Sequence, residues 1–255
     1  MLRTLTAFCA VVAAAAIFSQ HPARAAELTT KEVLDQKGDG PDGQGNTADD
    51  TWQFWFQLVH NPNQYGLLDR YSADVPKAGI PRKVTGPVAS KLPNPDDTVG
   101  WIYHSDWDGR FEGVWADKKT NSVIAYPYVE KRSHCAVAVT YKVPEDGKYT
   151  ISGTVTDMMV EPFKGVVGRL GMVEHDGVEL IVEIADGANR VSEVGRSKAI
   201  GDDDKKGSEP RPDSDKFEFK GVELKKGQLV RFVIHPRKWW GSDLTKLENL
   251  KIEKE

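Results

Sequence analysis

The sequence predicts an all-β protein, a sandwich or barrel of short antiparallel strands behind an irregular N-terminal leader. Two observations predict this class. Short runs with apolar residues at every second position recur through the second half of the chain, and turn signals separate these runs. The chain has 255 residues, of which 39% are hydrophobic and 28% charged, so it is long enough to bury a core and too apolar for general disorder.

The strands of the second half follow from the alternation of apolar and polar residues. Asp-Gly pairs at 146–147, 176–177 and 186–187 predict turns, because this dipeptide supplies the positive φ that tight hairpins require. Lys225-Lys226-Gly227 is a similar signal. The predicted strands are residues 136–143, 149–155, 178–184, 217–224, 229–234 and 247–252.

The first half is less regular. Residues 52–59 are apolar on both faces, so their pattern fits a strand or a helix. Residues 74–98 contain five prolines, which predicts an irregular connection with room for one edge strand. Residues 201–215 are charged and almost free of apolar side chains, which predicts a long surface loop.

The N-terminus predicts export. Residues 1–25 resemble a secretory signal peptide: Arg3 supplies the positive charge, an Ala-rich apolar run follows, and cleavage is expected after Ala25, or alternatively after Ala26. A buried N-terminal helix is the alternative. The mature protein would be secreted or periplasmic, with a net charge of −6 in place of −4 and with Cys135 as its one cysteine. Residues 26–50 are expected to be a Gly/Asp-rich leader, and residues 51–255 a single β-sandwich domain.

Several functions are not indicated. The net negative charge disfavours general nucleic-acid binding, and no later segment is long and apolar enough for a membrane span. The histidines lack zinc-ligand spacing, and there is no nucleophile elbow or phosphate loop. A structural calcium ion is one interpretation of the oxygen-bearing residues of the leader, a solvated loop being the other; these residues are Asp39, Asp42, Asn46, Asp49 and Asp50.

Two motifs in residues 136–252 resemble a known family. Pro144, Gly147 and Tyr149 form a P-x-x-G-x-Y turn, and residues 222–232 fit the unit V-x-L-x-x-G-x-x-V-x-F. This combination is similar to the galactose-binding-like jelly roll of many non-catalytic carbohydrate-binding modules. The resemblance implies a jelly-roll β-sandwich and a glycan ligand. It also implies that a structural calcium is possible, although no full ligand set is matched. Fold-level analogy alone does not establish function.

Residues 101–115 contain the first candidate site. Asp108-Gly109 predicts a two-residue hairpin in which Trp107 faces Arg110 and Ser105 faces Glu112. In this register Tyr103 faces Val114, and one face carries Trp101, Tyr103, Trp107, Arg110 and Glu112. Aromatic rings beside charged groups suit a sugar, which has an apolar C–H face and a polar rim. The alternative is that the aromatic residues pack the core, with Arg110 covering Trp107.

The second candidate site is the pair Trp239 and Trp240. Pro236 should end the preceding strand, which leaves the pair in a loop. Neighbours in an extended loop cannot both face one core, so one of them is expected to be exposed and available for recognition. The alternative is that one Trp caps the open end of the sandwich.

The sequence therefore predicts a secreted, non-catalytic carbohydrate-binding β-sandwich whose partner is a polysaccharide or glycan. Trp101, Tyr103, Trp107, Arg110, Trp239 and Trp240 would form or flank its binding surface. One alternative is a glycoside hydrolase or polysaccharide lyase using Asp106 and Asp108, although Asp108 is already explained as a turn residue. Another is a structural cell-surface interaction protein that docks a partner through the Trp loop.

Overall fold

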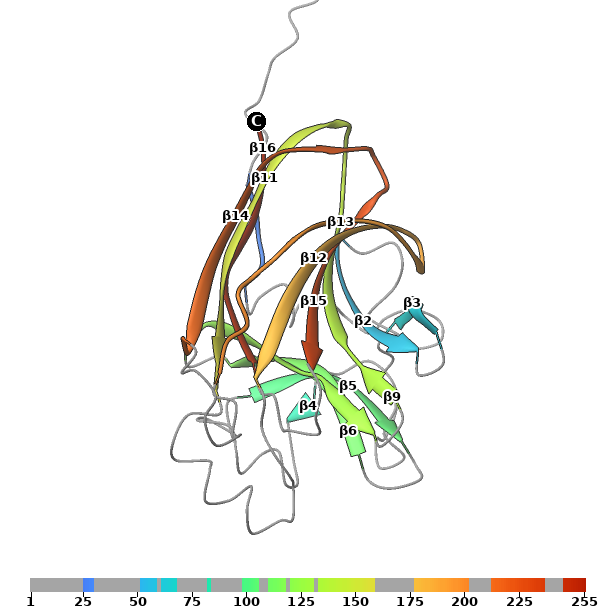
Figure 1. Ribbon diagram of the computed structural model, residues 1–255, viewed down its shortest axis with the longest axis vertical. Coiled ribbons are helices and arrows are strands. Elements are labelled where there is room, and N and C mark those ends of the chain that lie inside the picture. The colour runs from blue at the N-terminus through green and yellow to red at the C-terminus, as the bar shows by residue number, and fades with distance from the viewer. Residues whose placement is uncertain are drawn as a thin grey trace, which may run out of the picture.

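The computed structural model describes residues 25–29, 51–58, 61–67, 82–83, 98–105, 110–117, 120–130, 133–158, 177–201, 212–236 and 245–255. Every regular element among these residues is a strand, and the strands form two antiparallel sheets (Figure 1). The predicted all-β sandwich of antiparallel strands is thus confirmed. Within the described residues no helix is long and apolar enough to cross a membrane.

Sheet A has eight strands. Its order is β14 (Ser214–Leu224), β11 (Gly147–Asp157), β16 (Thr245–Lys254), β7 (Ser122–Tyr126), β6 (Arg110–Asp117), β5 (Thr98–Ser105) and β4 (Arg82–Lys83), and β1 (Ala26–Glu27) also pairs with β16. The short strand β4 lies in the proline-rich connection, where the sequence left room for one edge strand.

Sheet B has six strands and closes on itself. Its order is β10 (Val137–Lys142), β15 (Leu229–Pro236), β12 (Val178–Asp186), β13 (Asn189–Arg196), β3 (Asn61–Leu67) and β2 (Trp52–Leu58). One residue pair, Asn189 with Gln64, joins β13 to β3. A separate two-stranded ribbon consists of β8 (Tyr128–Glu130) and β9 (Ser133–Cys135).

Two β-bulges explain why sheet B curls. Val191 and Val194 are extra residues on β13, since each falls between consecutive pairs of its ladder with β12. Each bulge bends the strand and increases its twist. Gly187 supplies the turn before β13, where its φ of +54° fits the predicted Asp186-Gly187 hairpin. Gly147, by contrast, has no positive φ: it is the first residue of β11, so the Asp-Gly prediction is wrong there.

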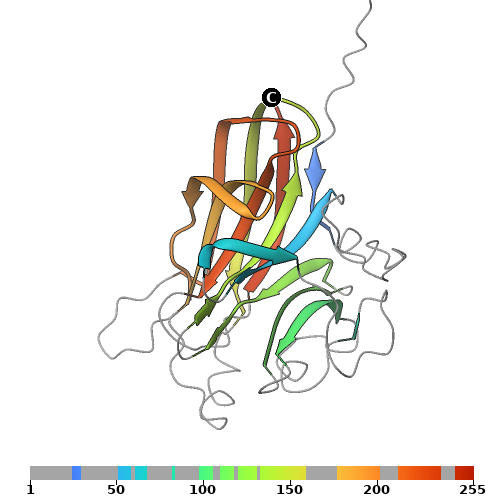
Figure 2. The ribbon, with the colours of Figure 1, turned by 90° about the vertical axis from the view of Figure 1, so that its right-hand side faces the viewer.

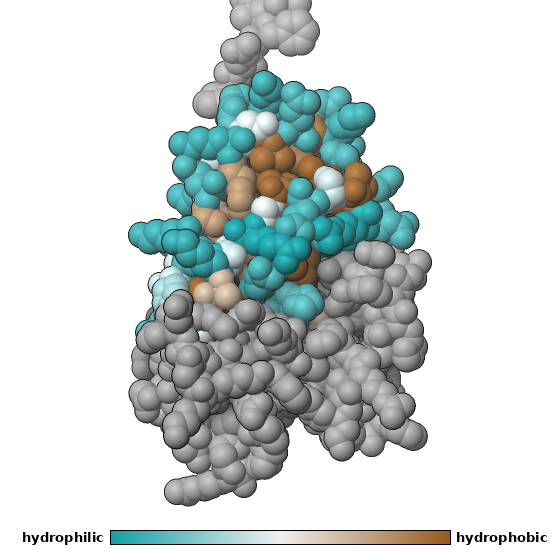
Figure 3. Space-filling model, in the orientation of Figure 1, coloured by the Kyte–Doolittle hydropathy of each residue, from teal (hydrophilic) through white to brown (hydrophobic). Residues whose placement is uncertain are grey.

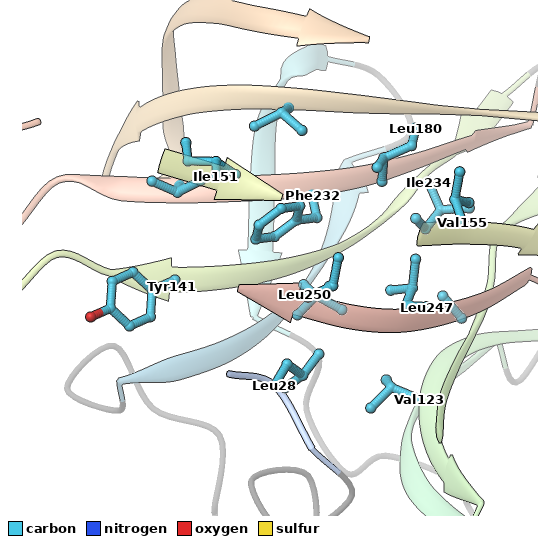
Figure 4. Packing of buried hydrophobic residues seen from close by; sticks show 14 of the residues in the cluster. Leu28, Val123, Tyr141, Ile151, Val155, Leu180, Phe232, Ile234, Leu247 and Leu250 are labelled. Carbon is cyan, nitrogen blue, oxygen red and sulfur yellow. The ribbon is translucent and has the colours of Figure 1, made fainter. Parts of the chain in front are cut away.

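The core lies between the two sheets (Figure 4). Sheet A contributes Ile151, Val155 and Leu247, among others, and sheet B contributes Leu180, Phe232 and Ile234. A smaller cluster lies on the opposite face of sheet B and consists of Trp55, Ala136, Ala138, Ile181, Ala185, Leu229 and Val233. Sheet B therefore buries apolar residues on both faces. This decides the ambiguous residues 52–58 in favour of a strand, because a strand buried on both sides loses its polar alternation.

The first residues of the expected leader belong to the sandwich. Ala26 and Glu27 pair with Ile252 and Lys251, and the backbone N–H of Leu28 donates to the C=O of Leu250 at 3.0 Å. The Leu28 side chain is buried in the main core, as Figure 4 shows. Cleavage at the predicted position after Ala25 would leave this short strand intact.

Candidate functional site

Strands β5 and β6 form the predicted aromatic hairpin. Trp101 and Tyr103 lie in β5 and Arg110 begins β6, and for all three the structure describes only the backbone. Trp107, Trp239 and Trp240 fall outside the described residues, as do Asp106, Asp108 and the acidic residues of the leader. In both views of the ribbon the hairpin lies at the end of the molecule opposite the C-terminus (Figures 1 and 2).

The register of this hairpin differs from the prediction by two residues. Tyr103 pairs with Glu112 and Ser105 with Arg110, so residues 106–109 connect the strands in place of a two-residue turn. The prediction was wrong because it treated Asp108-Gly109 as the whole turn, whereas four-residue connections are also common in hairpins. A shift of two residues is one full side-chain period, so the face shared by positions 101, 103, 110 and 112 is retained.

The backbone register relates Trp101 to the core. Its cross-strand partner Val114 is fully buried and belongs to the main core. This row of cross-strand partners continues from Val114 to Ala125 of β7 and then to Thr245 of β16, and both of these residues are buried. Position 101 therefore stands in a buried row, whereas Tyr103 and Arg110 stand progressively closer to the hairpin tip.

The same row links the two predicted aromatic groups. Residues 237–244, which carry Trp239 and Trp240, connect Pro236 at the end of β15 to Thr245 at the start of β16. Because Thr245 opposes Ala125 and Lys246 opposes Ile124, the chain enters β16 from the side on which the hairpin tip lies. The tip-side ends of β5 and β6 and the start of β16 thus lie at the same end of sheet A.

A row of buried polar residues crosses sheet B on the face opposite the main core. Gln53 opposes Thr140, Thr140 opposes Arg231, and Arg231 opposes Glu183, so the row spans four adjacent strands. The first three residues have no exposed surface, and Glu183 is 2% exposed. The Thr140 hydroxyl is buried and has no hydrogen-bond partner among the described residues.

Arg231 is the centre of this row. Its guanidinium lies 3.5 Å from the Glu183 carboxylate, donates to the C=O of Gly187, and sits 5.1 Å from the ring centroid of Trp55. The Trp55 indole N–H in turn donates to Gln53 Oε1 at 3.0 Å. A buried guanidinium needs such partners, because an uncompensated charge in the interior is expensive.

A chain of ion pairs connects this buried centre to the surface. Arg190 Nε lies 3.3 Å from Glu183 and its Nη2 lies 2.6 Å from Glu193. Arg196 then pairs with Glu193 at 2.6 Å and with Glu179 at 3.0 Å, and its side chain is 45% exposed. Acidic and basic groups alternate along the chain, so the network ties β12 to β13 without a large net charge.

The environment shifts the pKa values of this network in opposite directions. Burial raises the pKa of Glu183, and attraction to Arg231 and Arg190 offsets only part of that effect. Hydrogen bonds from Arg196 hold the pKa of the more exposed Glu193 below its ordinary range. Glu183 is therefore the member whose charge the fold disfavours.

The polar row was missed in the sequence, although a signal for it exists. Glu183 interrupts the apolar run of β12, and Arg231 interrupts that of β15. In a sheet that is buried on both faces, neither position is expected to face solvent. Such an isolated charge in a buried strand requires a partner. Among the described residues there is no group of three or more His, Cys, Asp or Glu side chains that could hold a metal ion.

Comparisons with known proteins give remote structural similarities. No protein-family model and no curated protein matches the chain. Two similar structures are cleaved adhesin domains of the Lys-gingipain from Porphyromonas gingivalis W83. The K3 domain has a TM-score of 0.31 and 10% identity and covers 52% of this chain and 74% of its own; the K1 domain has 0.31 and 12% and covers 60% and 89%.

A third similar structure is TmCBM61 in complex with β-1,4-galactotriose. It has a TM-score of 0.29 and 10% identity, and the match covers 63% of this chain and 83% of that one. A carbohydrate-binding module is thus among the structures to which the chain is similar. The assignment of the fold stands on the strand pairing of the chain itself.

Proposed function

We propose that this protein binds carbohydrate without cleaving it. The binding surface would lie at the end of the sandwich that carries the β5–β6 hairpin tip and the segment between β15 and β16. Tyr103, Trp107, Arg110, Trp239 and Trp240 would contact the glycan, and Trp101, which stands in the buried row, would flank them.

One observation carries the proposal. The row from Trp101 through Val114 and Ala125 to Thr245 supports it, because this register brings the tip side of the β5–β6 hairpin and the start of β16 to one end of sheet A. Three strand spacings of about 4.8 Å separate Trp101 from Thr245, a distance of about 14 Å that an oligosaccharide of a few units can span. Strands hold the residues of a site more precisely than loops do, and Trp101, Tyr103 and Arg110 belong to strands.

The residue types support a glycan ligand. An aromatic ring offers a flat apolar surface to the C–H face of a sugar, and the amphipathic rings of Tyr and Trp favour recognition surfaces. The Arg110 guanidinium would add directional hydrogen-bond donors for sugar hydroxyl groups. Export to the periplasm or the exterior, as residues 1–25 suggest, would bring the protein to polysaccharides.

The experiment is retention of the purified protein in native gels that contain soluble polysaccharides of plant, algal and microbial origin. We include β-1,4-galactan because the TmCBM61 structure contains β-1,4-galactotriose. Retention in at least one gel, without release of reducing ends from that polysaccharide, supports a non-catalytic binding protein. Release of reducing ends supports an enzyme instead, and no retention in any gel contradicts the proposal.

The matched control is Lys226→Ala. Lys226 is exposed in the turn between β14 and β15, at the opposite end of the sandwich, and its backbone N–H rather than its side chain bonds Asp146 Oδ1. This variant should keep the retention of the wild-type protein.

A further inference from the structure

Strand β14 is the outer edge of sheet A. Among the described residues its one neighbour in the sheet is β11. The backbone N–H of Asp157 donates to the C=O of Asp213 at 2.8 Å, which sets the alternation of the ladder. Asp215, Phe217 and Phe219 therefore bond to β11, whereas Ser214, Lys216 and Glu218 direct their backbone N–H and C=O groups away from it.

The residues whose backbone groups face outward are exposed and carry alternating charges. Ser214, Lys216, Glu218 and Lys220 are all exposed. Glu218 pairs with Lys220 at 3.0 Å, but both side chains are more than half exposed, so this pair contributes little. Lys216 has no ion-pair partner among the described residues. The ladder is regular up to Phe219, and a bulge with Gly221 at a φ of +66° follows.

We propose that two copies of the chain associate through this edge, with their β14 strands paired antiparallel about a two-fold axis at Phe217. Lys216 of each copy then opposes Glu218 of the other, and Ser214 opposes Lys220. An isologous contact of this kind is the commonest interface of homo-oligomers. The inference goes beyond carbohydrate binding, because the contact uses the backbone and charged side chains of an edge strand and none of the predicted aromatic residues.

Charge complementarity indicates both the partner of the β14 edge, which is a second copy of β14, and the register in which the two strands pair. With the axis at Phe217, two Lys–Glu pairs form across the new ladder, and opposite charges facing each other on paired strands are stabilising. An axis at Lys216 or at Glu218 would set like charges opposite each other. An axis at Phe219 would run the ladder into the bulge at Gly221. The residues before the bulge, Ser214 to Phe219, therefore complement a second copy of themselves.

Apolar surface beside this edge would strengthen the contact. Val194 and Phe219 are only partly buried where they pack against the core. Figure 3 shows apolar surface in the upper half of the molecule, in the region between β13 and β14 of Figure 1. A strand added to β14 would cover part of this surface and remove it from water.

The test is sedimentation equilibrium of the purified protein over a wide concentration range. We expect a monomer–dimer equilibrium for the wild-type chain. Glu218→Lys should weaken the dimer by about tenfold or more, because Lys216 then faces a lysine twice. The double variant Lys216→Glu/Glu218→Lys should restore the dimer, since it reverses both charges and keeps them complementary. Glu223→Lys, an exposed charge reversal on the same strand beyond the bulge, is the matched control.

Thermal unfolding of each variant shows whether it has folded. A chain that stays monomeric at the highest concentration reached overturns the proposal. A wild-type dimer that is equally strong in Glu218→Lys overturns it as well. A dimer lost in Glu218→Lys but not restored in the folded double variant overturns the proposed register.

Discussion

Arg231 and Glu183 oppose each other on adjacent strands of sheet B, with the guanidinium 3.5 Å from the carboxylate and both side chains almost fully buried. Their pair forms one end of the polar row that crosses the second face of this sheet. Arg231 is also held by Trp55 and by the C=O of Gly187. Through these contacts Arg231 links β2, which carries Trp55, to the hairpin of β12 and β13.

Removing Arg231 should be costly. Arg231→Met leaves the Glu183 carboxylate buried beside Arg190 alone and should lower the free energy of unfolding by about 3–5 kcal/mol. The double variant Arg231→Met/Glu183→Leu removes both charges and should recover most of this loss, because apolar pairs of similar volume often replace buried ion pairs without cost. Urea unfolding measures both values. Equal destabilisation in the single and double variants would contradict this interpretation.

The raised pKa of Glu183 predicts a pH dependence of stability. The folded state holds the Glu183 proton more strongly than the unfolded state does, since the pKa lies above its ordinary value of 4.5. The contribution of Glu183 to the free energy of unfolding therefore falls as the pH rises from about 4.5 through the raised pKa. Glu193 has a lowered pKa and acts in the opposite sense, so a reference variant is needed.

Glu183→Gln is that reference, because glutamine does not titrate. Relative to the wild-type protein, this variant should become more stable as the pH rises above about 4.5. Urea unfolding at a series of pH values measures the difference. If the difference is constant, or moves in favour of the wild-type protein with rising pH, the burial of Glu183 does not dominate its pKa.

Gly195 of β13 lies directly against Phe219 of β14. A Cβ atom at this position would lie 2.3 Å from a ring atom of Phe219. Gly195→Ala should therefore destabilise the protein by about 1–3 kcal/mol, as overpacking does in other cores. In a Phe219→Leu background, which lacks the ring, Gly195→Ala should lower the stability by less than it does in the wild-type protein. Thermal unfolding distinguishes the two, and an additive result would argue against the contact.

Leu28 tests whether the residues after the predicted cleavage site belong to the fold. Leu28→Ala should lower the free energy of unfolding by about 2–4 kcal/mol, because this side chain is 6% exposed and packs on the core. Glu27→Ala is the control: its carboxylate lies 3.7 Å from Lys251 with both side chains well exposed, so little should change. A measured mass of the intact exported protein that matches a chain beginning at Ala26 would support cleavage after Ala25. Similar stability of the two variants would show that β1 is dispensable.

The sequence predicted the parts of the fold that alternate regularly. Strands β10, β11, β12, β14, β15 and β16 coincide with the predicted runs to within a few residues. Strand β13 was missed because its two bulges break the alternation, and β3 was missed because Asn61–Leu67 contains few apolar residues. In both cases pairing with neighbouring strands, rather than local pattern, sets the structure.

The candidate site was predictable only as a set of residue types. Alternation correctly assigned positions 101, 103, 110 and 112 to one face. The register was predicted wrongly because it depends on the length of the connection, and Asp108-Gly109 was taken to be the whole turn. The position of the start of β16, on the side of the hairpin tip, depends on the order of strands in sheet A. That order is a long-range property, which no local motif encodes.

The most direct test of carbohydrate binding is affinity electrophoresis of the Trp239→Ala/Trp240→Ala variant and of Val191→Ala, beside the wild-type protein. Val191 is a large apolar residue, 58% exposed, on the bulged part of β13, and it serves as the matched control. On the polysaccharide that retains the wild-type protein, the account predicts that the double Trp variant loses most of its retention while its thermal unfolding is unchanged, and that Val191→Ala is retained fully. Full retention of a folded double Trp variant would contradict the account.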